Sequence, residues 1–178
     1  MIGNFIADHI KGSAWKKFPE EIKNGILLHR FIDDYTDHHP VVEKSKARLR
    51  NQFHKYTPVI VDVYYDHFLA SLWNQYSDEL LFDYSQRVYK IILTQNEILP
   101  ERTKYILQFM IKENWLLHYA TTEGLNKILT AMSHRAKFEN NMHDAAAFLE
   151  KHYDDFKNEF IVFFEELKNE VAKKRNGE

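Results

Sequence analysis

The sequence predicts an all-α fold, a single-domain bundle of about seven to eight helices. Apolar residues recur at offsets of three and four along most of the chain, which is the spacing of one face of an α-helix. Only five Gly and four Pro interrupt this pattern in 178 residues. The 44% hydrophobic content is ordinary for one globular domain, and no repeat or low-complexity segment divides the chain. We therefore expect residues 1–178 to form one domain.

The positions of proline and of capping residues place the expected helices. Pro19 suits the first turn of a helix that reaches about His39, and Pro40 ends that helix. Thr57 is expected as the N-cap of the helix that begins around Pro58. The expected helices cover about residues 4–11, 19–39, 40–53, 57–76, 78–95, 101–119, 122–136 and 142–174.

The composition excludes several classes of function. The chain has no Cys, so thiol catalysis, thiolate metal ligands and disulfides are excluded. The net charge of −2 predicts no general attraction to nucleic acid. No stretch approaches the apolar length of a membrane span. We expect a cytoplasmic protein that binds neither nucleic acid nor membrane.

Ionisable residues stand where helix packing favours apolar ones. Ile22, Ile26, His29, Asp33 and Asp37 lie at offsets of three and four, so they share one helix face. If this face points inward, its carboxylates need a partner or a cation, because an isolated charge is costly to remove from water.

A second segment repeats the pattern. Asp62, Asp66, Leu69 and Trp73 lie at offsets of four, three and four. Two helices would then present an imidazole and several carboxylates to one space, as in the metal sites of helical bundles. Oxygen and nitrogen ligands without sulfur suit manganese, magnesium, iron or zinc. The two stripes therefore predict a divalent metal site.

Each of these residues also has a structural interpretation. His29 can be a core imidazole bonded to a carbonyl, and Asp37 can cap a loop or pair with a Lys. Asp62 can accept hydrogen bonds from a helix N-terminus. Asp66 and His67 are adjacent, so their side chains point about 100° apart around the helix. One of them is therefore expected to hydrogen-bond to a metal ligand instead of binding the ion.

A basic strip is expected on the third helix. Lys44 and Arg48 share one face at an offset of four, and Lys46 and Arg50 share the neighbouring face. A solvated surface explains such a strip without any partner. His38 similarly suits the negative end of a helix, with a phosphate contact as the alternative.

Three segments resemble the acyl carrier protein phosphodiesterase family. They are GNFIADHIKG, FPEEIKNGILLHRFIDDYTDHHP and TPVIVDVYYDHFLASLW, which carry the elements GN-x-x-x-D, HR-x-ID-x-x-TD-x-HP and D-x-x-x-DHFL-x-x-x-W in order. The later segments MSHR and HYDDFKNEF fit more loosely. Members of this family usually begin with an NFLAH-like segment, which does not precede Met1 here. We therefore do not expect full activity. The resemblance covers nearly the whole chain.

The resemblance implies metal-dependent hydrolysis of the phosphodiester that joins 4′-phosphopantetheine to holo acyl carrier protein, giving apo carrier and free phosphopantetheine, a reaction of lipid metabolism. It also implies a distant likeness to HD-type phosphohydrolases. The implied metal ligands are Asp8, His29, Asp33 and Asp66, with Mn²⁺ favoured over Mg²⁺, Fe²⁺ or Zn²⁺. Asp8, Asp33 and His67 are the expected catalytic residues. Asp37 and Asp62 are expected to hydrogen-bond to the metal ligands without binding the ion themselves.

Acyl carrier proteins are acidic, so the resemblance also gives the cationic residues a partner. The residues expected to bind the partner or its phosphate are Arg30, His38, Lys44, Lys46, Arg48 and Arg50, with steering by Lys11, Lys16 and Lys17. Two alternatives stay open: a phosphohydrolase that acts on a nucleotide or small phosphoester, and a carrier-binding protein without turnover. The oligomeric state is not predicted.

Overall fold

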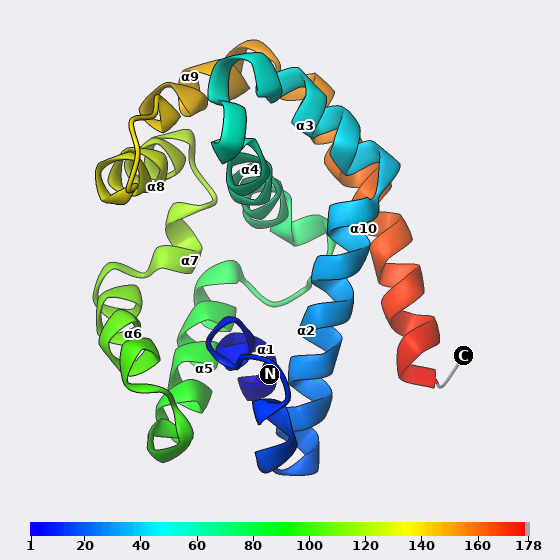
Figure 1. The fold of residues 1–178 in the computed structure, drawn as a ribbon, viewed down its shortest axis with the longest axis vertical. Helices are drawn as coiled ribbons and strands as arrows, with labels where there is room; N and C mark the ends of the chain where they lie inside the picture. Colours follow the sequence, from blue (N-terminus) through cyan, green and yellow to red (C-terminus); the bar gives the residue numbers. More distant parts are fainter. Residues whose placement is uncertain (177–178) are drawn as a thin grey trace.

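The computed structural model describes residues 1–176, and all regular structure in that range is helical. Seven of its α-helices have thirteen residues or more, which confirms the all-α prediction. None of the described helices is both long and apolar enough to cross a bilayer. The α-helices (Figure 1) are α1 (Ile2–Ile6), α2 (Glu20–His38), α3 (Pro40–Phe53), α4 (Thr57–Ser71), α5 (Leu81–Leu93), α6 (Glu101–Glu113), α7 (Trp115–His118), α8 (Thr122–Arg135), α9 (Ala145–Lys151) and α10 (Tyr153–Asn176).

Two of the expected helices are each divided in the structure. Asn114 adopts a left-handed conformation with φ of 46° and separates α6 from α7. Asn tolerates this conformation better than most residues, and it commonly ends a helix. His152 separates α9 from α10 within the expected 142–174 helix. The periodicity continues across both breaks, which is why the sequence did not reveal them.

The predicted N-cap at Thr57 is wrong. Thr57 is the first residue of α4 and already has helical dihedral angles of −51° and −48°. A 3₁₀ turn over His54–Tyr56 leads directly into α4, so no extended residue precedes it. The Thr57 hydroxyl is buried and has no hydrogen-bond partner among the described residues.

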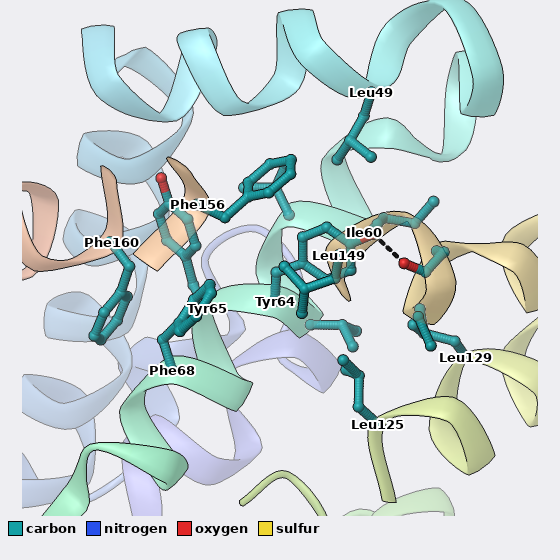
Figure 2. Close-up of a cluster of buried hydrophobic side chains, with 14 of the residues drawn as sticks. Leu49, Ile60, Tyr64, Tyr65, Phe68, Leu125, Leu129, Leu149, Phe156 and Phe160 are labelled. Atoms are coloured by element: carbon teal, nitrogen blue, oxygen red, sulfur yellow. Dashed lines mark hydrogen bonds between the residues drawn. The ribbon is translucent and has the colours of Figure 1, made fainter. Parts of the chain in front are cut away.

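Two hydrophobic cores hold the helices together. The larger lies between α3, α4, α8, α9 and α10, and aromatic side chains such as Tyr64, Phe68 and Phe160 belong to it (Figure 2). The Tyr64 hydroxyl donates a hydrogen bond to the Ala145 carbonyl and so ties α4 to the start of α9. The smaller core joins α1, α2, α5 and α6 through residues that include Ile26 and Ile92.

The contact between α1 and α2 is made by the backbone. A Cβ added to Gly3 would lie 2.0 Å from the Ile22 carbonyl oxygen, and one added to Gly25 would lie 2.9 Å from the Gly3 Cα. No side chain fits at either position without moving the helices apart. Glycine at both positions therefore sets how closely α1 approaches α2.

A buried ionic network fixes α3 against α10. Glu159 is 5% exposed and accepts hydrogen bonds from the Ser45 hydroxyl at 2.7 Å and from Arg48 Nη1 at 2.8 and 2.9 Å. Ser45 also contacts the Tyr65 hydroxyl, 2.9 Å away. Every member has a partner, so the network is a structural clamp.

Replacing Glu159 with Ala should therefore lower the free energy of unfolding by about 3 kcal/mol, because Arg48 loses the buried carboxylate that accepts its hydrogen bonds. Urea unfolding measures this. The matched control is Glu165→Ala on the same helix, which removes only a surface pair with Lys168 and should cost less than about 0.5 kcal/mol. Equal costs for the two variants would contradict the clamp.

Candidate metal centre

Asp8 reaches α2 because of the glycine contact between α1 and α2. A 3₁₀ turn over Ala7–His9 follows α1 and carries Asp8. One helical turn beyond Gly25, α2 presents His29 to this 3₁₀ turn. Arg30 then secures the following residues, since its Nη2 donates a hydrogen bond of 2.7 Å to the Ile10 carbonyl. The Arg30 guanidinium, which is expected from the sequence to bind the partner or its phosphate, therefore contacts the backbone of its own chain.

Asp8, His29 and Asp33 converge on one point. His29 Nε2 lies 3.0 Å from Asp8 Oδ1 and 3.2 Å from Asp33 Oδ2. One ligand atom from each residue lies within 4.8 Å of the other two. His29 is half-buried, whereas the side chains of Asp8 and Asp33 are 76% and 54% exposed. The three groups thus meet at an accessible surface.

The donor set fits a divalent cation. Adjacent ligands of an octahedral ion with bonds of about 2.1 Å are about 3.0 Å apart, which is the separation of His29 Nε2 from each carboxylate oxygen. One imidazole and two carboxylates, without sulfur, suit a first-row divalent ion or magnesium. Because the two Asp side chains are exposed, water or substrate could also reach an ion held by these three residues.

Further carboxylates continue from this cluster toward α4. Partial burial raises the pKa of Asp33; His29 opposes this increase, and the charges of Asp8 and Asp37 add to it. Burial raises the pKa of Asp62 to about 6, and Asp37 and Asp33 add to this while Lys46 opposes it. We call Asp8, Asp33, Asp37, Asp62 and Asp66 the aspartate row. The predicted stripes on α2 and α4 therefore face a common space.

That space is open to solvent, which corrects the expectation of an inward-facing site. All five members of the aspartate row are exposed, although α4 is otherwise buried around most of its circumference. Five carboxylates in a dry interior would be far too costly, whereas water screens them at an accessible surface. The row is thus an acidic surface in contact with solvent.

Asp66 lies at the far end of the row. Asp66 is partly open to solvent, but protein atoms surround much of its carboxylate. This burial raises the pKa of Asp66 to about 7, and the charge of Asp62 adds to the effect. Asp66 borders a pocket of about 180 Å³ that is also lined by Trp73 and Tyr119. It does not belong to the three-residue cluster in the described chain.

His67 is placed in the larger core, only 2% exposed. Its Nδ1 donates to the Tyr119 carbonyl at 2.8 Å, and its Nε2 accepts from the Tyr153 hydroxyl at 3.3 Å. Burial lowers the pKa of His67, with the Tyr119 hydrogen bond opposing. With both ring nitrogens engaged, the geometry gives His67 a packing role and offers no support for the predicted catalytic one.

The expected basic strip on α3 is not an open positive surface. Lys46 is 7% exposed and pairs with Asp37 at 3.1 Å, beside the aspartate row. Acidic residues of the same chain also pair with the other three cations: Glu159 with Lys44 and Arg48, and Glu43 with Arg50.

His38 and His39 differ although they are neighbours. His38 is exposed, and its Nδ1 donates to the Asp34 carbonyl at 2.8 Å near the end of α2. His39 is buried, and its Nδ1 accepts from the Val41 amide, so its Nε2 donates to Glu166 at 3.0 Å. His39 thereby joins the turn between α2 and α3 to α10. The sequence pattern did not distinguish it from a surface residue.

A pocket of about 310 Å³ adjoins the cluster on the other side of Asp8 and His29. Residues of α1, including Asn4, and of α6, including Thr103, complete its wall together with His9 of the 3₁₀ turn. Sequence reasoning missed His9 and Thr103. Asn4, which also lines the pocket, belongs to the GN-x-x-x-D element, but Thr103 lies on an ordinary amphipathic helix and gives no signal in the sequence.

Replacing Asp66 with Asn should stabilise the metal-free protein at high pH. Because the pKa of Asp66 is raised in the folded state, its ionisation opposes folding as the pH increases from about 4 to 7. The gain in unfolding free energy should be on the order of 1 kcal/mol at pH 8 after allowing for solvent screening, and absent at pH 4. Urea unfolding in EDTA at both pH values tests this; a gain independent of pH would contradict it.

Replacing Gly25 with Ala should weaken metal binding without touching a ligand. The added Cβ pushes α1 from α2, and Asp8 moves away from His29. We expect a loss of Mn²⁺ affinity of about tenfold or more, measured by calorimetry. The control is Asn24→Ala, an exposed neighbour on α2. Unchanged Mn²⁺ affinity in a folded Gly25→Ala protein would show that the glycine contact does not set the site.

The sequence was also compared with those of known proteins. The family model for acyl carrier protein phosphodiesterase matches residues 1–167. A protein of that description from Escherichia coli O6:H1 is 28% identical over 175 residues, which cover 98% of this chain and 91% of the relative. One from Klebsiella pneumoniae subsp. pneumoniae is 31% identical over 169 residues, which cover 93% and 86%.

No solved structure matches the chain, so the likeness to HD-type phosphohydrolases stays a prediction. The match to the family model extends over all three motifs and over the helices that carry the aspartate row. The chain belongs to the acyl carrier protein phosphodiesterase family.

Proposed function

We propose that this protein hydrolyses the phosphodiester of holo acyl carrier protein, with a divalent cation, and releases 4′-phosphopantetheine and apo carrier. The observation that carries the proposal is the convergence of Asp8, His29 and Asp33 within 4.8 Å at an accessible surface. The relatives bear the name of this activity. A cytoplasmic location stays a prediction.

Asp8, His29 and Asp33 would hold the cation, with Mn²⁺ as our preferred ion. When bound, such an ion lowers the pKa of a coordinated water and offsets the charge that develops on the phosphoryl oxygens. The exposure of Asp8 and Asp33 leaves room for a phosphodiester between them and solvent.

A carboxylate that is not used as a ligand is needed to orient the attacking water and accept its proton. Asp62 fits this role because it is accessible and lies close enough to Asp33 for their charges to interact. Its pKa of about 6 is near the operating range of a general base at neutral pH. Lys46, held by Asp37, contributes a positive charge beside Asp62 that keeps this carboxylate ionised.

The acidic carrier would approach through the loop that follows Asp8. Lys11, Lys16 and Lys17 are exposed there, and no acidic side chain within the described range pairs with them. By contrast, the α3 cations already have acidic partners. A positive loop beside the site can steer an acidic partner and orient its phosphodiester.

Asp33→Asn and Asp34→Asn form a matched pair for the decisive experiment. Both residues are exposed aspartates on α2, but only Asp33 contacts His29. Wild-type protein with holo carrier and Mn²⁺ should remove the phosphopantetheine mass from the carrier, as read by mass spectrometry. Asp33→Asn should lose at least about 100-fold of this activity, and Asp34→Asn should lose little.

Two results would contradict the proposal. Hydrolysis of a nucleotide or small phosphoester without any change in carrier mass would favour the alternative phosphohydrolase. Binding of the carrier with neither metal uptake nor product would favour a carrier-binding protein without turnover.

A further inference from the structure

The pocket beside Asp8 and His29 contains buried polar atoms without partners. The Thr103 hydroxyl and His9 Nδ1 are buried, and neither has a hydrogen-bond partner among the described residues. Thr103 is only 2% exposed. Both residues line the same pocket of about 310 Å³.

Such atoms are costly unless something bonds to them. Leaving a buried donor or acceptor unpaired costs about 1–3 kcal/mol, and the large majority of buried polar groups in folded proteins have a partner. Two unpaired atoms in the wall of one pocket therefore indicate an occupant that carries hydrogen-bonding groups. The adjoining Asp8 and His29 place that occupant next to the proposed cation.

The rest of the wall is apolar. Phe5 of α1 and Ile106 and Met110 of α6 line the pocket around Thr103 and His9. The volume is near the lower limit of about 300 Å³ for small-ligand sites, so the pocket admits an extended single chain and excludes a folded segment. A suitable occupant alternates amide or hydroxyl groups with short hydrocarbon segments.

We infer that this pocket binds the pantetheine arm of the substrate while the phosphodiester lies at Asp8 and His29. This inference rests on the proposed function. The arm has two amides and a hydroxyl, separated by methylene groups and a dimethyl carbon. Its amides match the Thr103 hydroxyl and the His9 imidazole, which can each donate or accept, and its hydrocarbon parts match Phe5 and Ile106.

A pocket of similar size between α7 and α8 is less suited to the arm. It measures about 290 Å³ and is lined by residues such as Trp115 and Met132. None of the aspartate row lines it, nor does any of the unpaired buried atoms of the described chain. Of these two pockets, the one beside Asp8 combines contact with the cluster and unsatisfied polar groups.

Thr103→Val tests the inference, with Thr57→Val as its matched control. Both threonines are 2% exposed and have unpaired hydroxyls, but Thr57 lies outside the pocket. Both substitutions should preserve the fold and raise Tm slightly, because each removes a buried unpaired hydroxyl. Only Thr103→Val should weaken binding of free 4′-phosphopantetheine, by about tenfold, which corresponds to one hydrogen bond. Calorimetry measures the affinity, and inorganic phosphate serves as the ligand without an arm.

The same two variants are then assayed on holo carrier and on a small aryl phosphodiester. Thr103→Val should lower kcat/KM for holo carrier about tenfold and leave hydrolysis of the small diester unchanged. Equal phosphopantetheine affinity in the Thr103→Val and Thr57→Val proteins would overturn the inference. So would wild-type protein that binds phosphate as tightly as phosphopantetheine. A Thr103→Val protein with lower Tm and unchanged affinity would assign the hydroxyl to a buried water.

Failure of the proposed function would look different. If wild-type protein binds 4′-phosphopantetheine, and more weakly after Thr103→Val, but does not cleave holo carrier, the pocket assignment holds and the phosphodiesterase proposal falls. If holo carrier is cleaved equally well by wild-type and Thr103→Val proteins, the phosphodiesterase proposal holds and the pocket assignment falls.

Discussion

The close backbone contact between Gly3 and Gly25 is the constraint on which the candidate site depends. It allows α1 to lie directly on α2, and the 3₁₀ turn after α1 then carries Asp8 to His29. The hydrogen bond from Arg30 to the Ile10 carbonyl holds the following residues in place. A side chain at either glycine would separate the helices, and the cluster would lose one of its two carboxylates.

The electrostatics of the site follow from its position at an accessible surface. Burial raises the pKa values of Asp33, Asp62 and Asp66, and repulsion by neighbouring carboxylates of the row adds to each increase. Lys46 is the cation that opposes this repulsion at Asp62, while solvent screens the remaining charge. A divalent ion at Asp8, His29 and Asp33 would relieve the repulsion further. On this account the protein tolerates the acidic row without an ion and would gain stability from binding one.

Local periodicity predicted much of the fold and part of the site. The offsets in α2 placed His29 and Asp33 on one face, and the structure shows their contact. The nearness of Asp8 to His29 is different, because these residues are 21 positions apart and meet only through the glycine contact. Helical spacing carries no information about it, and the family motif supplied the prediction. Similarly, the α3 cations suggested an open basic strip because the acidic partner of two of them, Lys44 and Arg48, is distant in sequence: Glu159 lies 111 residues after Arg48. Thr103 and His9 gave no signal at all, since an unpaired buried atom is a property of packing.

The central claim is that Asp8, His29 and Asp33 form one cation site. Paramagnetic broadening of backbone amide signals by substoichiometric Mn²⁺ tests it most directly, since the effect falls steeply with distance from the ion. The account predicts that the signals of Asp8, His29 and Asp33 disappear first, followed by those around Asp62. Broadening centred elsewhere, or spread evenly over exposed acidic residues such as Asp34 and Asp78, would contradict it.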